Sequence, residues 1–353
     1  MFMDQLGGPY CNFNCSIRFN SNRYKNYFLL MTKKIILINL IIVFVLIISL
    51  ELIFNFFKLS GLMGIQRGLI YSKNDTFFLS PNSEGIVFDE KVFTDKYGFR
   101  VPYENYDYSN KENIFILGDS VAFGNGISED KTFVGLLRNS IIKKNFLNTS
   151  VPGYQISHHV KNIEIIKNFS NVEKILYFFT LNDIYGSSNL VGLNNDDEIN
   201  EGSFSLKDFK IFNLLNEYLR NKSYLYMYIK GISTDPSKRW FINLNNFYQN
   251  FDISNIKSQI NQLDTFSKKI DSDFIVIILP YEYQTRNCER NDLTPQKKIS
   301  KVLKESNINF IDLTSSFCDI KNPKKYFYKF DPMHLSKNGH MLVFKSLSNE
   351  NIF

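Results

Sequence analysis

Three residue types that together can break an ester bond occur in one order along the chain: a serine, an aspartate and a histidine. Ser120 stands in FILGDSVAFGNG, the stretch from Phe115 to Gly126, while Asp331 and His334 stand in FDPMHLSKNGH. Attack on an ester carbonyl needs an oxygen nucleophile, a base that takes its proton and a carboxylate that orients the base. Ser120 fits the first role, His334 the second, and Asp331 the third.

Two further residues could supply donors to the oxyanion that develops during such an attack. Gly153 lies in NTSVPGYQ, and Asn182 lies in FTLNDI directly before Asp183. The backbone N–H groups of Ser120 and Gly153, with the side-chain amide of Asn182, would form an oxyanion hole. The loss of one such donor typically costs about 3–4 kcal/mol of transition-state stabilisation. Glycine suits this role because a residue without Cβ lets its N–H approach a substrate closely.

Five short apolar runs must position these residues. They predict strands over residues 113–119, 146–151, 174–183, 273–280 and 309–314. Helical patterns fall between them, at about residues 130–144, 156–169, 253–270 and 294–306. Strands that are apolar on both faces and alternate with helices indicate a parallel sheet covered on both sides. Each candidate residue lies beyond a strand end, so all of them should meet at the carboxyl rim of the sheet, where open α/β sheets bind ligands.

These motifs resemble those of the SGNH (GDSL-like) hydrolase superfamily over roughly residues 112–346. The resemblance implies a three-layer α/β/α sandwich with a five-stranded parallel sheet of the flavodoxin-like type, and a serine hydrolase without a cofactor. It places the family's catalytic and oxyanion-hole residues at Ser120, Gly153, Asn182, Asp331 and His334. The text DKYGFR, which ends at Arg100, is similar to the lead-in of membrane-anchored bacterial members.

One position departs from the family's pattern. The third block usually reads Gly-x-Asn-Asp, and here it is TLND, with Thr180 in place of the glycine. Since Thr180 has no proposed contact with substrate, the departure concerns local backbone shape. Each motif also has a plain structural interpretation: GDS and ND occur in ordinary turns, and DPMH could be a loop with His334 at the surface.

The other histidines are expected to have structural places. His340 should pack or cap within a helix, and His158 and His159 are expected at the surface or facing a lid. Adjacent residues do not point the same way on a helix, so this pair does not predict a metal site. The glycines of GDSVAFGNG match neither G-x-G-x-x-G nor a P-loop. The net charge of +6 is scattered rather than gathered in a stripe, which argues against a nucleic-acid partner.

An apolar run from Ile35 to Phe57 is long enough, as a helix, to cross roughly 30 Å of hydrocarbon. A small-x-small cleavage site is absent after it, which favours an uncleaved anchor over a signal peptide. Lysine and arginine are somewhat more frequent before the run, which points residues 1–34 into the cytoplasm and the rest of the chain outward. The chain before Met31 could be a cytoplasmic tail or could be missing from the mature protein.

Two segments surround or interrupt the predicted sheet. Residues 58–111 should be an extended lead-in with turns, followed by the hydrolase domain over residues 112–353. Residues 186–250 are longer than a crossover between two strands needs, so they are predicted to be an insertion. The insertion starts with a polar segment and continues with an aromatic helical stretch. A lid over the site and a purely structural helical pair are both open interpretations of this insertion.

The four cysteines fall in two pairs. Cys11 and Cys15 precede the apolar run, on the reducing side, and should be free thiols, whereas Cys288 and Cys318 follow it, where disulfides persist. The second pair follows two strands that are neighbours in a doubly wound sheet, so their Cα atoms could come within bridging range. A disulfide between them and two free thiols are both open.

Three functions follow from these patterns. The first is a membrane-anchored, extracytoplasmic serine esterase that removes acyl groups, with acetyl expected, from a carbohydrate or a lipid. The second is an O-acyltransferase that uses the same triad on a surface glycan, which would need a multi-pass partner to deliver its acyl donor. The third is a non-catalytic glycan-binding or assembly protein, which has no reason to keep Ser120, Asp331 and His334 together.

Overall fold

The computed structural model describes residues 21–353 except 74–75, 110, 185–209, 251, 290–291, 319 and 351. The chain divides into two units, Met1–Ile53 and Phe54–Phe353. Helix α1, Ser21–Phe56, makes up the described part of the first unit, and it is long and apolar enough from Leu29 to Phe56 to cross a membrane. A helix of this kind near the N-terminus fits a membrane anchor and a signal sequence alike.

Five parallel strands form one part of an eight-stranded sheet in the second unit. In chain order they are β6 (Glu112–Gly118), β7 (Lys144–Asn148), β8 (Val172–Phe179), β9 (Asp273–Ile278) and β10 (Asn309–Asp312). They lie in the order β10-β9-β8-β6-β7, and every neighbouring pair is parallel. This is the order of a flavodoxin-like doubly wound sheet, so the predicted fold class is confirmed.

The sequence of β6 shows why this sheet is buried on both faces. All residues of β6 after Glu112 are buried, and Ile114, Phe115 and Ile116 are completely inaccessible to solvent. A continuous apolar strand is typical of a parallel sheet that helices cover on each side. All five predicted strands extended past the observed ends, most of all two of them: the strand at 146–151 is β7, which ends at Asn148, and the strand at 174–183 is β8, which ends at Phe179.

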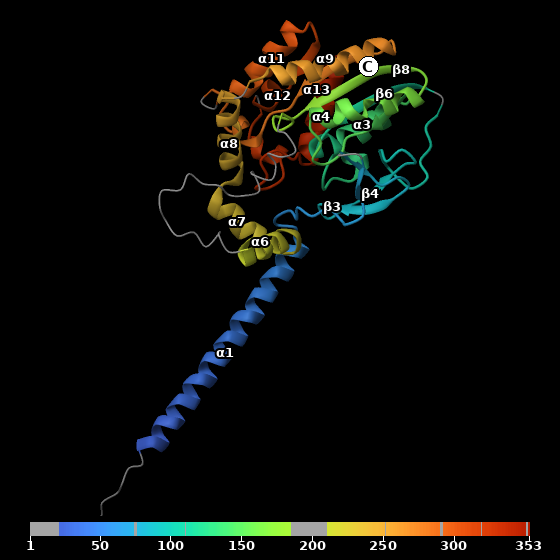
Figure 1. Cartoon of the computed structure of the whole chain (residues 1–353). Coiled ribbons are helices and arrows are strands. Elements are labelled where there is room, and N and C mark those ends of the chain that lie inside the picture. The colour runs from blue at the N-terminus through green and yellow to red at the C-terminus, as the bar shows by residue number, and fades with distance from the viewer. Residues whose placement is uncertain are drawn as a thin grey trace, which may run out of the picture. The chain divides into compact units, whose positions relative to one another are not determined.

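Helices around this sheet agree with the predicted pattern. They are α3 (Phe133–Ser140), α4 (Ile156–Asn162), α9 (Ser254–Lys269), α11 (Thr294–Glu305) and α13 (Lys337–Asn349), of which α13 was not predicted. Helix α3 packs against α13, and α4 packs against α9 (Figure 1). The first predicted helix starts later than expected because the side chain of Thr132 accepts a hydrogen bond from the N–H of Gly135 and caps α3.

The lead-in contributes strands of its own. A separate two-stranded sheet consists of β1 (Ile70–Lys73) and β2 (Thr76–Leu79). Beyond β7, the main sheet continues through β5 (Arg100–Val101), β4 (Glu90–Thr94) and β3 (Glu84–Val87), all antiparallel to their neighbours. The segment is extended, as predicted, but it is also part of the main sheet, which the sequence did not indicate.

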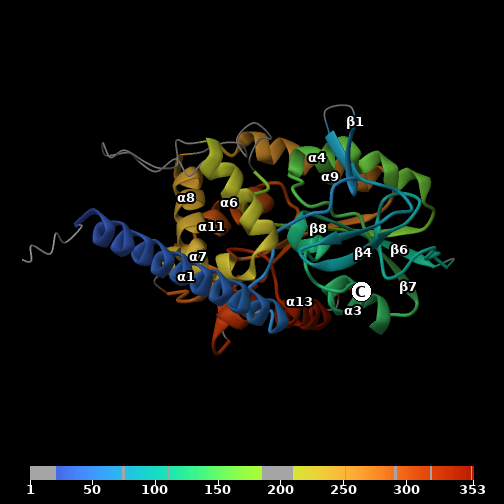
Figure 2. The same cartoon turned by 90° about the horizontal axis from the view of Figure 1, so that it is seen from below.

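The insertion is helical in the part that the structure describes. It contains α6 (Lys210–Lys222), α7 (Tyr224–Thr234) and α8 (Pro236–Asn250), which Figure 2 shows together. The predicted polar segment of the insertion lies mostly within residues 185–209, outside the described part. Between α6 and α7, the side chain of Ser223 accepts a hydrogen bond from the N–H of Tyr226 and starts the second helix.

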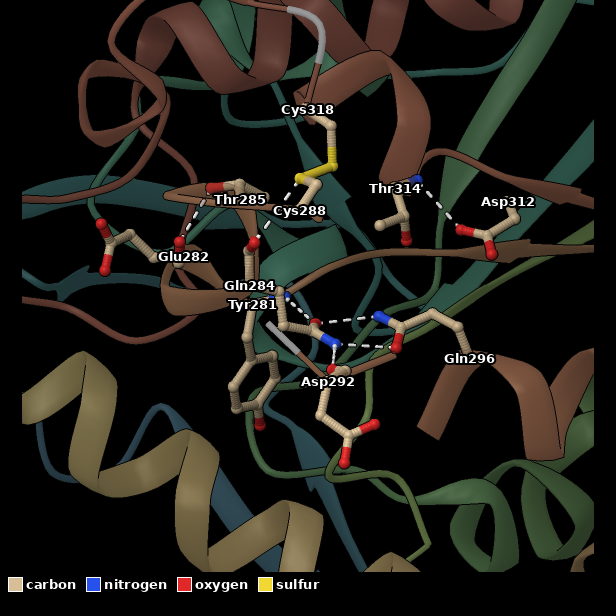
Figure 3. Close-up of a disulfide and its surroundings, with 10 residues drawn as sticks. All are labelled: Tyr281, Glu282, Gln284, Thr285, Cys288, Asp292, Gln296, Asp312, Thr314 and Cys318. Atoms are coloured by element: carbon tan, nitrogen blue, oxygen red, sulfur yellow. Dashed lines mark hydrogen bonds between the residues drawn. A yellow bond between two sulfur atoms is a disulfide. The ribbon is translucent and has the colours of Figure 1, made fainter. Parts of the chain in front are cut away.

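Cys288 and Cys318 form a disulfide, with their Cα atoms 5.8 Å apart (Figure 3). Cys288 follows the short helix α10 (Glu282–Thr285), and Cys318 ends helix α12 (Thr314–Cys318) after β10. The neighbouring strands β9 and β10 bring these two loops together, so of the two open alternatives the structure has the disulfide. Cys11 and Cys15 lie outside the described residues.

We expect the double variant Cys288→Ser/Cys318→Ser to lose about 3–4 kcal/mol of unfolding free energy, because the bridge closes a loop with a sequence separation of 30. Guanidinium unfolding of the variant and of the parent protein measures the difference. Equal unfolding midpoints, or alkylation of both cysteines in the parent without prior reduction, would contradict the bridge.

Candidate active site

Ser120, His334 and Asp331 form a continuous hydrogen-bonded chain. The His334 Nε2 atom lies 2.8 Å from the Ser120 Oγ atom, and the His334 Nδ1 atom lies 2.8 Å from the Asp331 Oδ2 atom. With the proton on Nδ1, the imidazole donates to the carboxylate and accepts from the serine hydroxyl. This is the arrangement in which a histidine removes the serine proton during attack on a carbonyl.

The Asp331 carboxylate is held by its own loop. Its Oδ1 atom accepts hydrogen bonds from the backbone N–H groups of Met333 (2.9 Å) and His334 (2.7 Å), while Oδ2 is left for the imidazole. The carboxylate is buried, and the His334 side chain is only 13% exposed. The short spacing of DPMH thus gives the aspartate a fixed direction toward the histidine.

The electrostatics of the pair suit a general base. Burial opposes the imidazolium, but the Asp331 carboxylate and its hydrogen bond outweigh burial, so the pKa of His334 is raised above its ordinary value of 6.5. Burial likewise opposes the carboxylate, but the imidazolium and the loop's hydrogen bonds outweigh it and hold the pKa of Asp331 below its ordinary value. The aspartate therefore stays ionised wherever the histidine titrates.

A pH profile tests this coupling. The base acts only when neutral, so kcat/KM for an ester should fall as the pH drops through the raised pKa of His334, with an acid limb above pH 6.5. Asp331→Asn removes the carboxylate that raises this pKa, and the limb should move to lower pH while the plateau falls. A limb that stays in place in Asp331→Asn would show that Asp331 does not act on His334.

The GDS turn places Ser120 at the end of β6, where the residue is buried. Ser120 begins helix α2 (Ser120–Phe123), and the Asp119 carboxylate caps it by accepting a hydrogen bond from the N–H of Val121. The helix ends at Gly124, whose φ of 85° favours glycine and whose Cβ would lie 2.6 Å from the Thr132 side chain. Aspartate and glycine therefore define the two ends of the turn that carries the serine.

The predicted oxyanion-hole residues lie beyond three different strands. Gly153 follows β7 and is exposed, Asn182 follows β8, and Ser120 follows β6. Gly153 has a φ of 87°, while a Cβ there would meet nothing closer than 3.5 Å. The backbone conformation, rather than crowding, therefore favours a glycine at this position.

Two side chains orient the Asn182 amide. The Tyr281 hydroxyl, 2.9 Å away, donates to its Oδ1 atom, and its Nδ2 atom lies 3.3 Å from the Asp119 carboxylate, beside the nucleophile. With Oδ1 engaged as an acceptor, the amide presents its N–H side toward the GDS turn. Tyr281 was not predicted; it comes directly after the expected strand at 273–280, which was its only signal in the sequence.

Thr180 has a side-chain role that the sequence did not indicate. Its hydroxyl donates to the buried Asp183 carboxylate at 2.8 Å, which also accepts hydrogen bonds from the Thr180 N–H and the Tyr177 hydroxyl. Burial and the nearby Asp119 carboxylate raise the pKa of Asp183 well above its ordinary value. Thr180, at the position where the resemblance predicts a glycine, therefore helps to fix the turn that carries Asn182.

Arg100, from the lead-in strand β5, supports the turn that carries Ser120 by binding the carbonyls that follow it. Its guanidinium is completely buried and donates to the carbonyls of Phe123 (2.6 Å), Gly124 (2.7 Å) and Ile127. Burial lowers the pKa of Arg100 to about 10, which leaves it charged at neutral pH. The arginine of the DKYGFR motif thus has a structural role, because it fixes the chain that follows α2.

We expect Arg100→Met to lower the unfolding free energy by about 3 kcal/mol or more, because three buried carbonyls each lose a charged donor. The value of kcat/KM should fall too, since the turn that carries Ser120 loses its support. Urea unfolding and ester kinetics measure the two effects, with the exposed Lys91→Met as the control for loss of a cation. Stability within about 1 kcal/mol of the parent would show that the guanidinium does not support the turn.

Of the other three histidines, two differ from expectation. His158 and His159 are buried, not at the surface: the His158 Nδ1 atom accepts from the N–H of Gln155, and burial lowers the pKa of His159 to about 3. His340 packs against Phe133 and accepts from its N–H, as expected of a structural residue. Within the described part of the chain, no group of three or more His, Cys, Asp or Glu residues is placed to hold a metal.

The insertion contacts the loop that carries the triad's aspartate and histidine. The Ser237 hydroxyl donates to the Asp331 carbonyl at 3.1 Å, and the Phe330 ring lies so close to Gly231 that a Cβ there would be 2.2 Å from it. A cavity of about 240 Å³ borders His334 and is lined on one side by insertion residues such as Trp240. The described helices therefore both support the loop and form one wall beside the histidine.

No protein-family model and no curated protein matches this chain. Among solved structures, a member of the lipolytic G-D-S-L family from Veillonella parvula is similar, with 13% identity and a TM-score of 0.40 over 68% of this chain and 98% of that chain. A lipase/acylhydrolase from Enterococcus faecalis has 15% identity and a TM-score of 0.39 over 68% and 94%. An acetylxylan esterase from Geobacillus stearothermophilus has 14% identity and a TM-score of 0.39 over 69% and 94%.

At this level of similarity the neighbours carry no inference about the reaction. The likeness of this chain to SGNH (GDSL-like) hydrolases rests on its own strand order and on the residues that follow its strands.

Proposed function

We propose that the protein is a membrane-anchored serine esterase that removes acyl groups, acetyl in particular, from a carbohydrate or a lipid. The observation that carries this proposal is the chain of two 2.8 Å hydrogen bonds from Ser120 through His334 to Asp331, beyond the ends of β6 and β10. A serine and a histidine at this distance, with a buried carboxylate behind the histidine, are what covalent acyl transfer requires.

The reaction follows from the positions of these atoms. The Ser120 Oγ attacks the ester carbonyl as its proton passes to the His334 Nε2, and the imidazolium is stabilised by the ionised Asp331. Donors from Ser120, Gly153 and Asn182 surround the oxyanion. His334 then gives the proton to the leaving alcohol, which departs and leaves an acyl-serine. Water, deprotonated by the same imidazole, then attacks the acyl carbonyl. The bond from the carbonyl to the Ser120 Oγ breaks, the imidazolium returns the proton to Oγ, and the acid leaves.

Two features support an extracytoplasmic position for the second unit. The apolar helix α1 is preceded by a modest excess of basic residues, which favours a cytoplasmic N-terminus. The Cys288–Cys318 disulfide lies after this helix, and disulfides persist in oxidising compartments. Protease added outside spheroplasts should therefore digest the second unit; digestion only after lysis would place it in the cytoplasm.

A series of p-nitrophenyl esters from acetate to octanoate tests the activity. The full-length protein in detergent should hydrolyse the short esters fastest, since the cavity beside His334 is small, about 240 Å³. Preference for the longest ester would contradict the expected acetyl specificity. Absence of hydrolysis across the whole series would contradict the esterase and favour the non-catalytic alternative.

A further inference from the structure

Helix α6 has its apolar side turned away from the protein. Phe212, Leu214, Leu215 and Tyr218 are each at least half exposed, with exposed fractions of 50%, 58%, 50% and 63%. Their spacing of three and four residues places them on one side of the helix. We call these four residues the α6 apolar face.

The residues of α6 that are partly buried are mostly polar, with Leu219 as the apolar one among them. The side chain of Asn216 accepts hydrogen bonds from the Tyr226 hydroxyl (2.7 Å) and from the Lys230 ammonium (2.9 Å), both on α7. Arg220 and Asn221 are also partly buried, in contact with Met63 and beside Gly64 respectively. A helix whose partly buried residues are mostly polar, while four of its large apolar side chains are at least half exposed, differs from an ordinary surface helix of a soluble domain, which buries its apolar stripe.

The chain fixes this helix close to the end of the apolar helix α1. Helix α1 ends at Phe56, and two residues later Lys58 donates to the Tyr224 hydroxyl of α7 at 2.6 Å. Ser60 donates to the Tyr224 carbonyl at 2.6 Å, and the Met63 N–H lies 3.5 Å from the Arg220 carbonyl, in the last turn of α6. At 3.3–3.6 Å per residue, the seven residues from Phe56 to Met63 span at most about 25 Å.

The apolar surface also continues beyond α6. A groove of about 840 Å³ separates Leu214 and Tyr218 from the lead-in, where Ile65 is 37% and Ile86 is 51% exposed. Charged residues of both signs border the groove, Arg67 and Lys222 together with Asp89 and Glu217. Large exposed apolar side chains on an amphipathic helix are typical of a helix that lies in the interface of a bilayer.

We infer that the α6 apolar face docks onto the surface of the membrane that α1 spans. The inference rests on α1 serving as an anchor, not on the reaction at Ser120. Its occupant is the lipid interface because the chain ties α6 within a few residues of the point where α1 would leave the bilayer. A second copy of the chain, or a segment of this chain outside the described residues, is the alternative occupant that the experiment must separate.

Site-directed spin labelling of the full-length protein in lipid nanodiscs tests this docking. With Cys11→Ser and Cys15→Ser, a label is attached at Leu215→Cys on the face. Matched controls carry it at Asn213→Cys, on another side of the same helix, and at Ile142→Cys, 71% exposed and between α3 and β7. The collision rate with oxygen, which concentrates in lipid, is compared with that of an aqueous nickel chelate.

We expect the oxygen-to-nickel collision ratio to be several-fold higher at Leu215→Cys than at either control. Equal ratios at all three positions would overturn the inference, because Leu215 would then face water. Low collision rates with both reagents at Leu215→Cys would overturn it too, because protein rather than lipid would then cover the face. Neither result depends on ester hydrolysis, so failure of the docking is distinguishable from failure of the esterase.

Discussion

Ser120→Ala should lower kcat/KM for p-nitrophenyl acetate by about 10⁴-fold or more while the protein stays folded. The substitution removes only the hydroxyl group, whose Oγ atom lies 2.8 Å from the His334 Nε2 atom. Without it the acyl-enzyme cannot form, and any residual rate comes from binding and oxyanion donors alone. Steady-state kinetics on the purified full-length variant measure the loss, and thermal unfolding confirms that the fold is kept.

The matched control is Ser348→Ala, on α13, where the exposed hydroxyl only donates to a backbone carbonyl of its own helix. This variant should keep the parent activity. If Ser120→Ala keeps more than a few per cent of the parent rate, or if both variants lose activity equally, Ser120 is not the nucleophile.

His334→Ala should cause a loss of similar size, because the serine then has no base. At neutral pH an unassisted serine hydroxyl is a weak nucleophile. The effect should not add to that of Ser120→Ala: the double variant should be about as slow as either single variant, since the two residues act as one unit. Kinetics of the three variants measured side by side give this comparison.

The loss of kcat/KM in Asp331→Asn should be smaller than that in His334→Ala by about tenfold or more, because Asp331→Asn still has an imidazole, although a misoriented one. A loss in Asp331→Asn as large as that in His334→Ala would mean that neither solvent nor a backbone carbonyl can orient the imidazole once the Asp331 carboxylate is gone. A nearly unchanged rate in His334→Ala would remove the general base from the mechanism.

The central part of the fold was predictable because burial dominates it. A strand such as β6, apolar on both faces and followed by a turn, is recognisable from local sequence. The exact ends of β7 and β8 were not, because the last apolar residues of each run lie in the turns that carry the site. β5 has only two residues, and its partner β7 lies far along the chain, so local patterns could not reveal it.

The site was predictable to the extent that its residues sit in short motifs beyond strand ends. Ser120, Asp331 and His334 came from such motifs, and the topology brings them together. Arg100 and Tyr281 could not be assigned from sequence because their roles depend on long-range contacts with the GDS turn and with Asn182. His158 and His159 were misplaced because neighbouring aromatic residues bury them, and no pattern of α4 shows that.

The orientation of α6 was hidden in the same way. Its amphipathic pattern predicts a helix, but the sequence does not say which side meets the protein. The contacts of Asn216 with Tyr226 and Lys230, together with the partial burial of Arg220 and Asn221, show which residues do. Since α7 also lines the cavity beside His334, through Met227 and Gly231, docking of α6 would hold that cavity near the lipid surface.

The identity of the nucleophile is tested most directly by covalent trapping. The full-length protein is treated with a fluorophosphonate, which reacts with activated serines, and the adduct is located by mass spectrometry of the digested protein. One adduct per chain on Ser120, absent from Ser120→Ala and formed much more slowly in His334→Ala, is the expected result. An adduct on another residue, or no adduct in a folded protein, would contradict the account.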